Sequence, residues 1–98
     1  MNIQKKMKEA QKIQKEMMAE QTKIEETIYT SKSSIVNVEM KGNKELIKIK
    51  IMAEEIQKDE IEMIEDMILV AINDVIGQIN KETETKLGKY TQGMPGIF

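Results

Sequence analysis

The sequence contains no cysteine, histidine, arginine or tryptophan among its 98 residues. The absence of cysteine and histidine excludes disulfides, thiolate nucleophiles and the usual zinc sites, and removes the commonest general base. We therefore predict no catalytic residue, no metal site and no other cofactor. The protein is expected not to be an enzyme and to have no small-molecule substrate.

Aromatic side chains are scarce, with only Tyr29, Tyr90 and Phe98 present. Three rings are too few to build the stacking platforms that single-stranded nucleic acids need. Without arginine, the bidentate contacts that identify bases in duplex DNA are also missing. Any binding to nucleic acid would therefore depend on lysine contacts to phosphates, with little sequence preference.

Long apolar runs are missing too, because no uninterrupted stretch approaches the ~18 residues of a membrane-spanning helix. The polar opening of the chain does not resemble a signal peptide, so we expect a cytoplasmic protein with no membrane partner. A chain of 98 residues is expected to form one domain over residues 1–98. It would bury a small share of its surface, so pairing with a second copy would stabilise it.

The formal net charge of −2 conceals an uneven distribution along the chain. Residues 1–23 carry six lysines and three glutamates, whereas residues 54–66 carry seven acidic residues and only Lys58. The two segments are therefore expected to present opposite electrostatic potentials.

The spacing of apolar residues predicts a first helix over residues 2–23. Steps of three and four residues place them in one narrow stripe, and such a stripe resembles the edge of a short coiled coil. The members of this stripe that we assign to a dimer interface are Ile3, Met7, Ile13 and Met17.

The period then changes to two, which predicts strands over residues 25–31, 35–41 and 44–53. In the third strand, isoleucines at 47, 49 and 51 alternate with Lys48 and Lys50, so we expect a buried row and a solvated row. Between the last two strands, Gly42-Asn43 suits a type II′ turn with a positive φ at the glycine.

A helical period returns over residues 59–87, where Asp59 and Glu62 have the spacing of a capping box. Its apolar arc is broad enough to need both the sheet and a second chain as cover. Asn73-Asp74 on this helix is expected to have a structural role, such as hydrogen bonding where the helix packs on the strands. The residues assigned to the dimer interface here are Met63, Met67, Ile68 and Ile72, and residues 88–98 are expected to form a loop.

The expected fold is therefore α+β: a helix, a three-stranded antiparallel sheet and a long C-terminal helix, in an intertwined or face-packed homodimer. The clearest candidate site is a row of lysines on the first helix, whose steps of three and four residues place them on one face. The alternative for such a row is an ordinary solvated helix face. The candidate DNA-binding residues are Lys5, Lys8, Lys12 and Lys15, with Lys86 and Lys89 as further candidates near the end of the second helix.

Several short motifs occur in the same order as in a known family. Residues 7–17 read Met-Lys-Glu-Ala-Gln-Lys-Ile-Gln-Lys-Glu-Met and resemble the opening helix of the YbaB/EbfC nucleoid-associated proteins. Three further segments resemble the strand and turn, the central helix and the C-terminal tail of that family. They are Val36 to Met40 with Gly42, Glu65-Asp66-Met67 with Ala71-Ile72-Asn73-Asp74, and Gly93-Met94-Pro95-Gly96-Ile97-Phe98.

This resemblance spans nearly the whole chain and implies a bacterial protein of the nucleoid. It implies a homodimer with projecting first helices that binds double-stranded DNA mainly through phosphate contacts. The alternative is a protein-interaction module with little or no DNA binding, in which the apolar stripe of the first helix or the methionine face of the second docks another protein.

Overall fold

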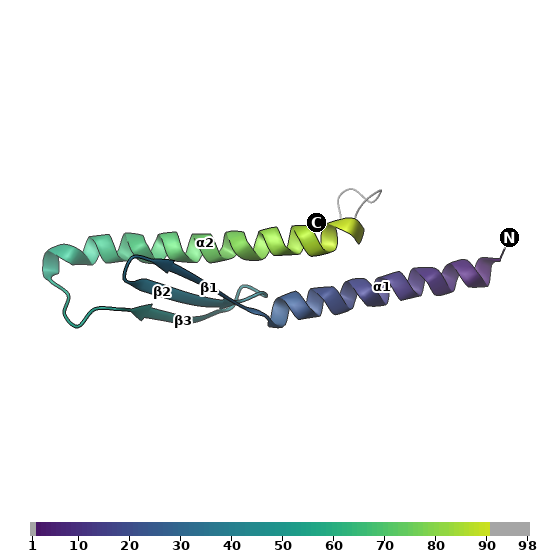
Figure 1. Cartoon of the computed structure of the whole chain (residues 1–98), viewed down its shortest axis with the longest axis horizontal. Helices are drawn as coiled ribbons and strands as arrows, with labels where there is room; N and C mark the ends of the chain where they lie inside the picture. Colours follow the sequence, from purple (N-terminus) through teal and green to yellow (C-terminus); the bar gives the residue numbers. More distant parts are fainter. Residues whose placement is uncertain (1, 91–98) are drawn as a thin grey trace.

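The computed structural model describes residues 2–90, which form two long helices and one small sheet (Figure 1). Along the chain these elements are α1 (Ile3–Glu26), β1 (Ile28–Ser33), β2 (Val36–Lys41), β3 (Leu46–Ile51) and α2 (Ile61–Leu87), with 3₁₀ turns at Lys58–Glu60 and Gly88–Tyr90. The sheet is antiparallel in the order β1-β2-β3. The predicted α+β fold is therefore confirmed.

The core lies between α2 and one face of the sheet. Val36 and Val38 on β2 are completely buried, as are Ala71 and Val75 on α2. Their spacing is two residues on the strand and four on the helix, which is how each element turns one face inward. The helix packs on β1 and β2 but makes little contact with β3.

The predicted burial of β3 is wrong, because every residue of this strand is exposed. Ile49 and Ile51 pair with the buried Val38 and Val36, so they point to the same inner face of the sheet. Since α2 does not extend over β3, these two isoleucines remain 41% and 36% exposed. Within the part of the chain that the structure describes, an apolar strip of the inner face is thus uncovered.

The first helix extends three residues further than predicted, so β1 begins at Ile28 and not at residue 25. Thr27 ends the helix: its backbone N–H donates to the Ile24 carbonyl at 3.2 Å and its hydroxyl donates to the Lys23 carbonyl at 2.6 Å. Its own carbonyl then accepts the Gly42 N–H at 2.9 Å. A side chain on Gly42 would overlap the Ile24 carbonyl, so glycine lets the β2–β3 loop pack against the end of α1.

The type II′ turn predicted at Gly42-Asn43 is not found there, and a turn of this kind lies in the other hairpin. Gly42 does not have a positive φ; the loop is closed by the Lys44 N–H donating to the Lys41 carbonyl at 2.8 Å, and Lys44 carries the positive φ of 70°. The two-residue turn with a positive φ at its first position occurs instead at Ser34, with φ 52°, between β1 and β2. That is the φ pattern of a type II′ turn.

The second helix begins at Ile61, after the 3₁₀ turn, and not at residue 59. The predicted pairing of Asp59 with Glu62 is replaced by one between Gln57 and Glu60. The Gln57 N–H donates to the Glu60 carboxylate at 3.3 Å, and the Glu60 N–H donates to the Gln57 carbonyl at 3.0 Å. Of the predicted loop 88–98, residues 88–90 form a 3₁₀ turn, and the tail motif at 93–98 lies outside the described residues.

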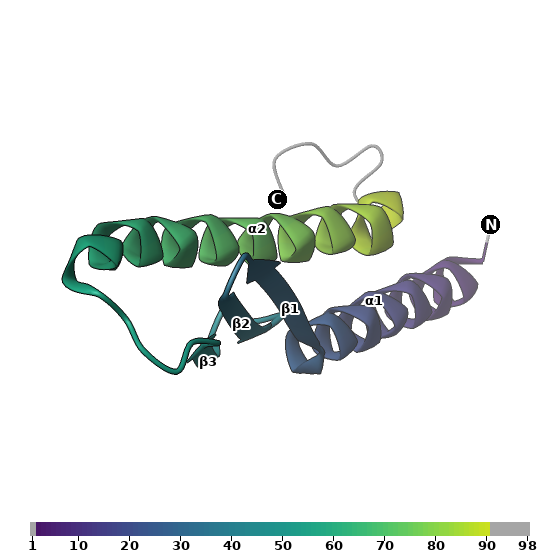
Figure 2. The ribbon, with the colours of Figure 1, turned by 60° about the vertical axis from the view of Figure 1, so that its left-hand side comes forward.

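The molecule is elongated, with principal extents of 73 × 22 × 14 Å. The N-terminal half of α1 extends beyond the end of α2, as two views of the chain show (Figures 1 and 2). In contrast, the C-terminal end of α1 contacts α2 and the β2–β3 loop. We call the projecting part, residues 3–18, the arm.

Candidate nucleic-acid interface

The lysines of the arm lie on the exposed part of helix α1. Asn2 caps the start of α1, because its side-chain oxygen accepts the Lys5 N–H at 3.1 Å. Residues 2–16 are all exposed. The structure therefore places Lys5, Lys8, Lys12 and Lys15 at the surface, on a helix long enough to align them.

A shallow hollow on the arm joins three of these lysines. It is lined by Lys8, Lys12 and Lys15, with Gln11, Gln14 and Met18 between and beside them. Ammonium and amide groups are the donors that bind phosphate oxygens without reading base edges. The hollow is thus a continuous surface of hydrogen-bond donors, and no carboxylate lines it.

The two predicted lysines near the end of α2 are in a different environment. Lys86 lines a hollow with Glu20, Lys23 and Glu82, between the C-terminal ends of the two helices. Lys89 lines an adjacent hollow, and its ammonium lies 5.0 Å from the centroid of the Tyr90 ring, a cation–π contact. Since carboxylates flank both lysines, their charge is less available than that of the arm.

Tyr29 lines the same hollow as Lys86 and the acidic side chain of Glu82. Burial raises the pKa of its phenol above the usual value, and the negative charge of Glu82 raises it further. The phenol therefore stays neutral at physiological pH. It can donate a hydrogen bond at the base of the arm but adds no charge there.

The residues assigned to the dimer interface fall into two groups. On the arm, Ile3, Met7 and Ile13 are 64%, 58% and 53% exposed, whereas Met17 is half-buried. On α2, Met63 is exposed, but Met67, Ile68 and Ile72 are half-buried and already pack against the core.

Asp74 holds β1 and α2 together, as expected of a structural group. Its carboxylate accepts the Ser31 hydroxyl at 2.6 Å and the Gln78 amide at 2.9 Å. The same Gln78 amide donates to the Thr30 carbonyl at 3.0 Å. The hydrogen bond from Ser31, and then that from Gln78, lowers the pKa of Asp74 below its usual value.

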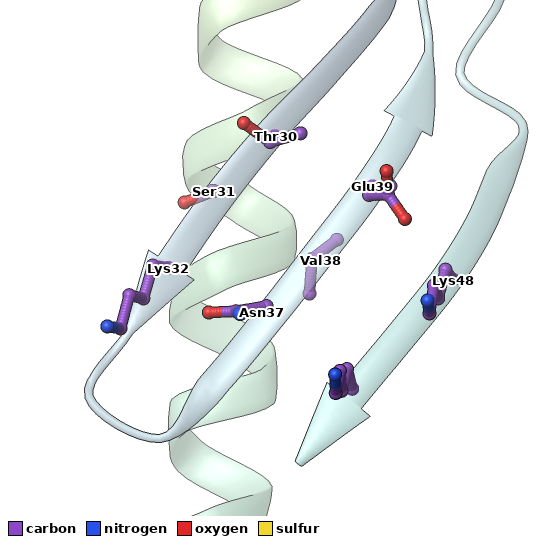
Figure 3. A pocket seen from close by; sticks show the side chains of 8 residues that line it. Thr30, Ser31, Lys32, Asn37, Val38, Glu39 and Lys48 are labelled. Carbon is purple, nitrogen blue, oxygen red and sulfur yellow. The ribbon is translucent and has the colours of Figure 1, made fainter. Parts of the chain in front are cut away.

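The outer face of the sheet, opposite α2, is a basic surface that was not predicted from the sequence. The pairing register brings Lys32, Asn37 and Lys50 into one row across the three strands. These residues line a hollow together with Thr30, Glu39 and Lys48 (Figure 3). From the sequence, Lys48 and Lys50 are expected only to form the solvated row of the third strand.

Within residues 2–90 no group of three or more acidic side chains is arranged to hold a metal ion. In the same part of the chain, no helix is long and apolar enough to cross a membrane.

Comparisons with known proteins agree on one family. Curated relatives named nucleoid-associated proteins include one from Lactococcus lactis, 42% identical over 97% of this chain and 98% of its own. Another, from Oceanobacillus iheyensis, is 40% identical over 99% of this chain and 97% of its own. An uncharacterized protein of Helicobacter pylori has the same fold, with a TM-score of 0.67 and 23% identity over 95% of this chain and 99% of that chain.

The model of the YbaB/EbfC DNA-binding family matches residues 1–94. The match covers both helices and the whole sheet, so it includes the arm and its lysines. The chain therefore belongs to the YbaB/EbfC DNA-binding family.

Proposed function

We propose that the protein is a nucleoid-associated protein that binds double-stranded DNA as a homodimer, through phosphate contacts and with low sequence preference. The observation that carries this proposal is the arm, whose exposed face bears Lys5, Lys8, Lys12 and Lys15. Curated relatives that align with this chain over nearly their whole length carry the name nucleoid-associated protein. The protein would thus act as a single domain located at the nucleoid, by binding and not by catalysis.

Lysine is suited to this role because its ammonium is a point charge that follows a phosphate backbone without selecting a base. The bidentate contacts to guanine that arginine makes are absent from this chain. Binding would be driven by the counterions that DNA releases when lysines neutralise its phosphates. Lys86 and Lys89 would contribute less, because Glu20 and Glu82 lie among the residues beside them.

The proposed homodimer accounts for the apolar surface that the protomer leaves uncovered. The inner face of β3 exposes Ile49 and Ile51 beside the buried core residues Val36 and Val38. On α2, Met63, Leu69 and Val70 are each at least 50% exposed. Apolar surfaces of this extent beside a core favour a partner, and a second copy would supply equivalent surfaces.

In this dimer the inner face of β3 would pack against the second copy, and so would the α2 residues Met63, Met67, Ile68 and Ile72. The apolar stripe of the arm, Ile3, Met7, Ile13 and Met17, would contact the partner along one side. The lysine row would remain free on another side of the same helix. Dimerisation and DNA binding therefore use different faces of α1.

The proposal is tested by the salt dependence of binding. Anisotropy of a labelled duplex of ~20 base pairs is titrated with the wild-type protein at ~50 and ~200 mM salt. Four phosphate contacts per protomer would make the affinity fall by more than about a hundredfold between these conditions. An affinity that does not change with salt would contradict phosphate binding, and no binding with an intact dimer would favour the protein-interaction alternative.

A further inference from the structure

The outer face of the sheet carries an excess of positive charge that is separate from the lysine row of the arm. Its side chains alternate with the buried ones, so Thr30 and Lys32 of β1 share this face with Asn37, Glu39 and Lys41 of β2. The register adds Lys48 and Lys50 of β3. This face of the sheet therefore carries four lysines and only one glutamate.

The lysines are not distributed evenly over this face. Glu39 lies directly between Thr30 and Lys48 in the pairing register, where it offsets one positive charge. The neighbouring row, Lys32–Asn37–Lys50, contains no acidic side chain. Two strand spacings separate its lysines, about 10 Å, so both ammonium groups can reach toward the asparagine between them.

Asn37 is the central member of the row, and its amide is not used inside the protein. Its side-chain oxygen is buried and has no hydrogen-bond partner among the described residues. Buried polar atoms are normally paired, so an unpaired amide oxygen in the middle of this row is not explained by the packing of the protomer. The amide nitrogen is a donor, which is what an anion between the two lysines requires.

Figure 3 shows Lys32, Asn37 and Lys48 on the side of the sheet turned away from α2, which lies behind the strands. The dimer proposed above covers the inner face of β3, so this outer face stays accessible. It is also distant from the arm along the sheet. Lys32 and Lys50 lie near the ends of their strands, whereas α1 joins the sheet at its other end, near Ile28 and Gly42.

We infer that the row Lys32–Asn37–Lys50, supported by Lys48, is a second phosphate-binding surface that contacts the backbone of double-stranded DNA. The inference rests on the proposed function, because that function supplies the duplex. The two lysines neutralise phosphates and the asparagine amide donates a hydrogen bond to a phosphate oxygen. With no arginine in the chain, the contact reads no bases.

The test compares two double variants of the full chain in the duplex titration, at several salt concentrations. The variant Lys32→Gln/Lys50→Gln removes two charges from the row. The matched control Lys44→Gln/Lys58→Gln removes two exposed lysines that lie outside the row and outside the arm. Each lost phosphate contact lowers the salt slope by about 0.9, so the row variant should lose up to about 1.8 for each protomer that contacts the duplex and bind several-fold more weakly.

Each result decides between the inference and the proposed function. A smaller slope for the row variant than for the control supports the inference. Equal slopes for the two variants, with strong binding by the wild type, would overturn the inference and leave the proposed function standing. Absence of wild-type binding would overturn both.

A second measurement does not depend on variants and so is unaffected if one fails to fold. The side-chain amide signals of Asn37 are followed by NMR in the wild-type protein while the duplex is added. The inference predicts shifts that saturate with the duplex and are reversed by salt. Unchanged Asn37 signals, while backbone signals of the arm shift, would show that only the arm contacts DNA.

Discussion

Single residues in the two hairpins adopt conformations that most side chains avoid. Ser34 and Lys44 have φ values of 52° and 70°, in the left-handed region that glycine occupies freely. A residue with a side chain pays about 1–2 kcal/mol there. Neither position is glycine, so both turns carry strain that a substitution can relieve.

Replacing Lys44 by glycine is expected to stabilise the protein. Relief of the left-handed strain gains about 1–2 kcal/mol, and the extra freedom of glycine in the unfolded chain costs about 0.5–1 kcal/mol. The net gain, on the order of 0.5–1 kcal/mol, should raise the melting temperature in circular dichroism. Lys44→Ala removes the same side chain and keeps the strain, so an equal gain in Lys44→Ala would contradict this account.

The hydrogen bonds at Asp74 predict a dependence of stability on acid pH. Because Ser31 and Gln78 lower the pKa of Asp74 in the folded protein, its charged form stabilises the fold at pH values above the unfolded pKa. That contribution is lost as the pH falls through the folded pKa. The midpoint of Asp74, followed by NMR of its carboxyl carbon, should therefore lie below that of an unfolded chain.

The matched variant is Ser31→Ala, which removes the hydrogen bond that contributes most to the shift. It should move the Asp74 midpoint upward and weaken the loss of stability in acid. An unchanged midpoint in Ser31→Ala would show that this hydrogen bond does not hold the carboxylate.

The elements themselves were largely predictable, because the period of the apolar residues distinguishes helices from strands. Val36, Val38 and Met40 alternate with polar residues within the predicted strand 35–41, and they are at most 3% exposed. The ends of elements were less predictable. The end of α1 depends on Thr27 and on the packing of Gly42 against Ile24, which joins residues distant in the sequence.

The third strand shows why periodicity alone does not predict burial. Its isoleucines alternate as a half-buried strand should, yet no element within residues 2–90 covers them. The alternation of apolar and polar residues indicates which side chains share one face of the sheet. Whether that face is covered depends on how far α2 reaches across the sheet.

The same distinction applies to the candidate site. The lysines of the arm could be recognised from the sequence, because Lys8, Lys12 and Lys15 are local neighbours on one helix. The row on the sheet could not, because Lys32 and Lys50 are eighteen positions apart in the sequence and meet only through the register of three strands.

At the scale of the whole molecule, the proposed dimer makes a prediction about β3. Ile49 is 41% exposed in the protomer, so Ile49→Lys should leave the protomer folded. In the dimer the same lysine would be buried without a partner, which is unfavourable. Light scattering after size exclusion should therefore find a folded monomer.

The control for this variant is Ile28→Lys, because Ile28 is 55% exposed and lies on the outer face of the sheet. This control should remain a dimer. A folded dimer in Ile49→Lys would show that the inner face of β3 is not the interface.

The central claim, that the lysines of the arm hold duplex DNA, is tested most directly by Lys8→Glu/Lys12→Glu. Both side chains are exposed and line the same hollow, so the exchange should leave the dimer and its melting temperature unchanged. Reversing two charges on the contact surface should abolish retention of a duplex in a gel-shift measurement at ~50 mM salt. A folded, dimeric double variant that retains the duplex as the wild type does would contradict the claim.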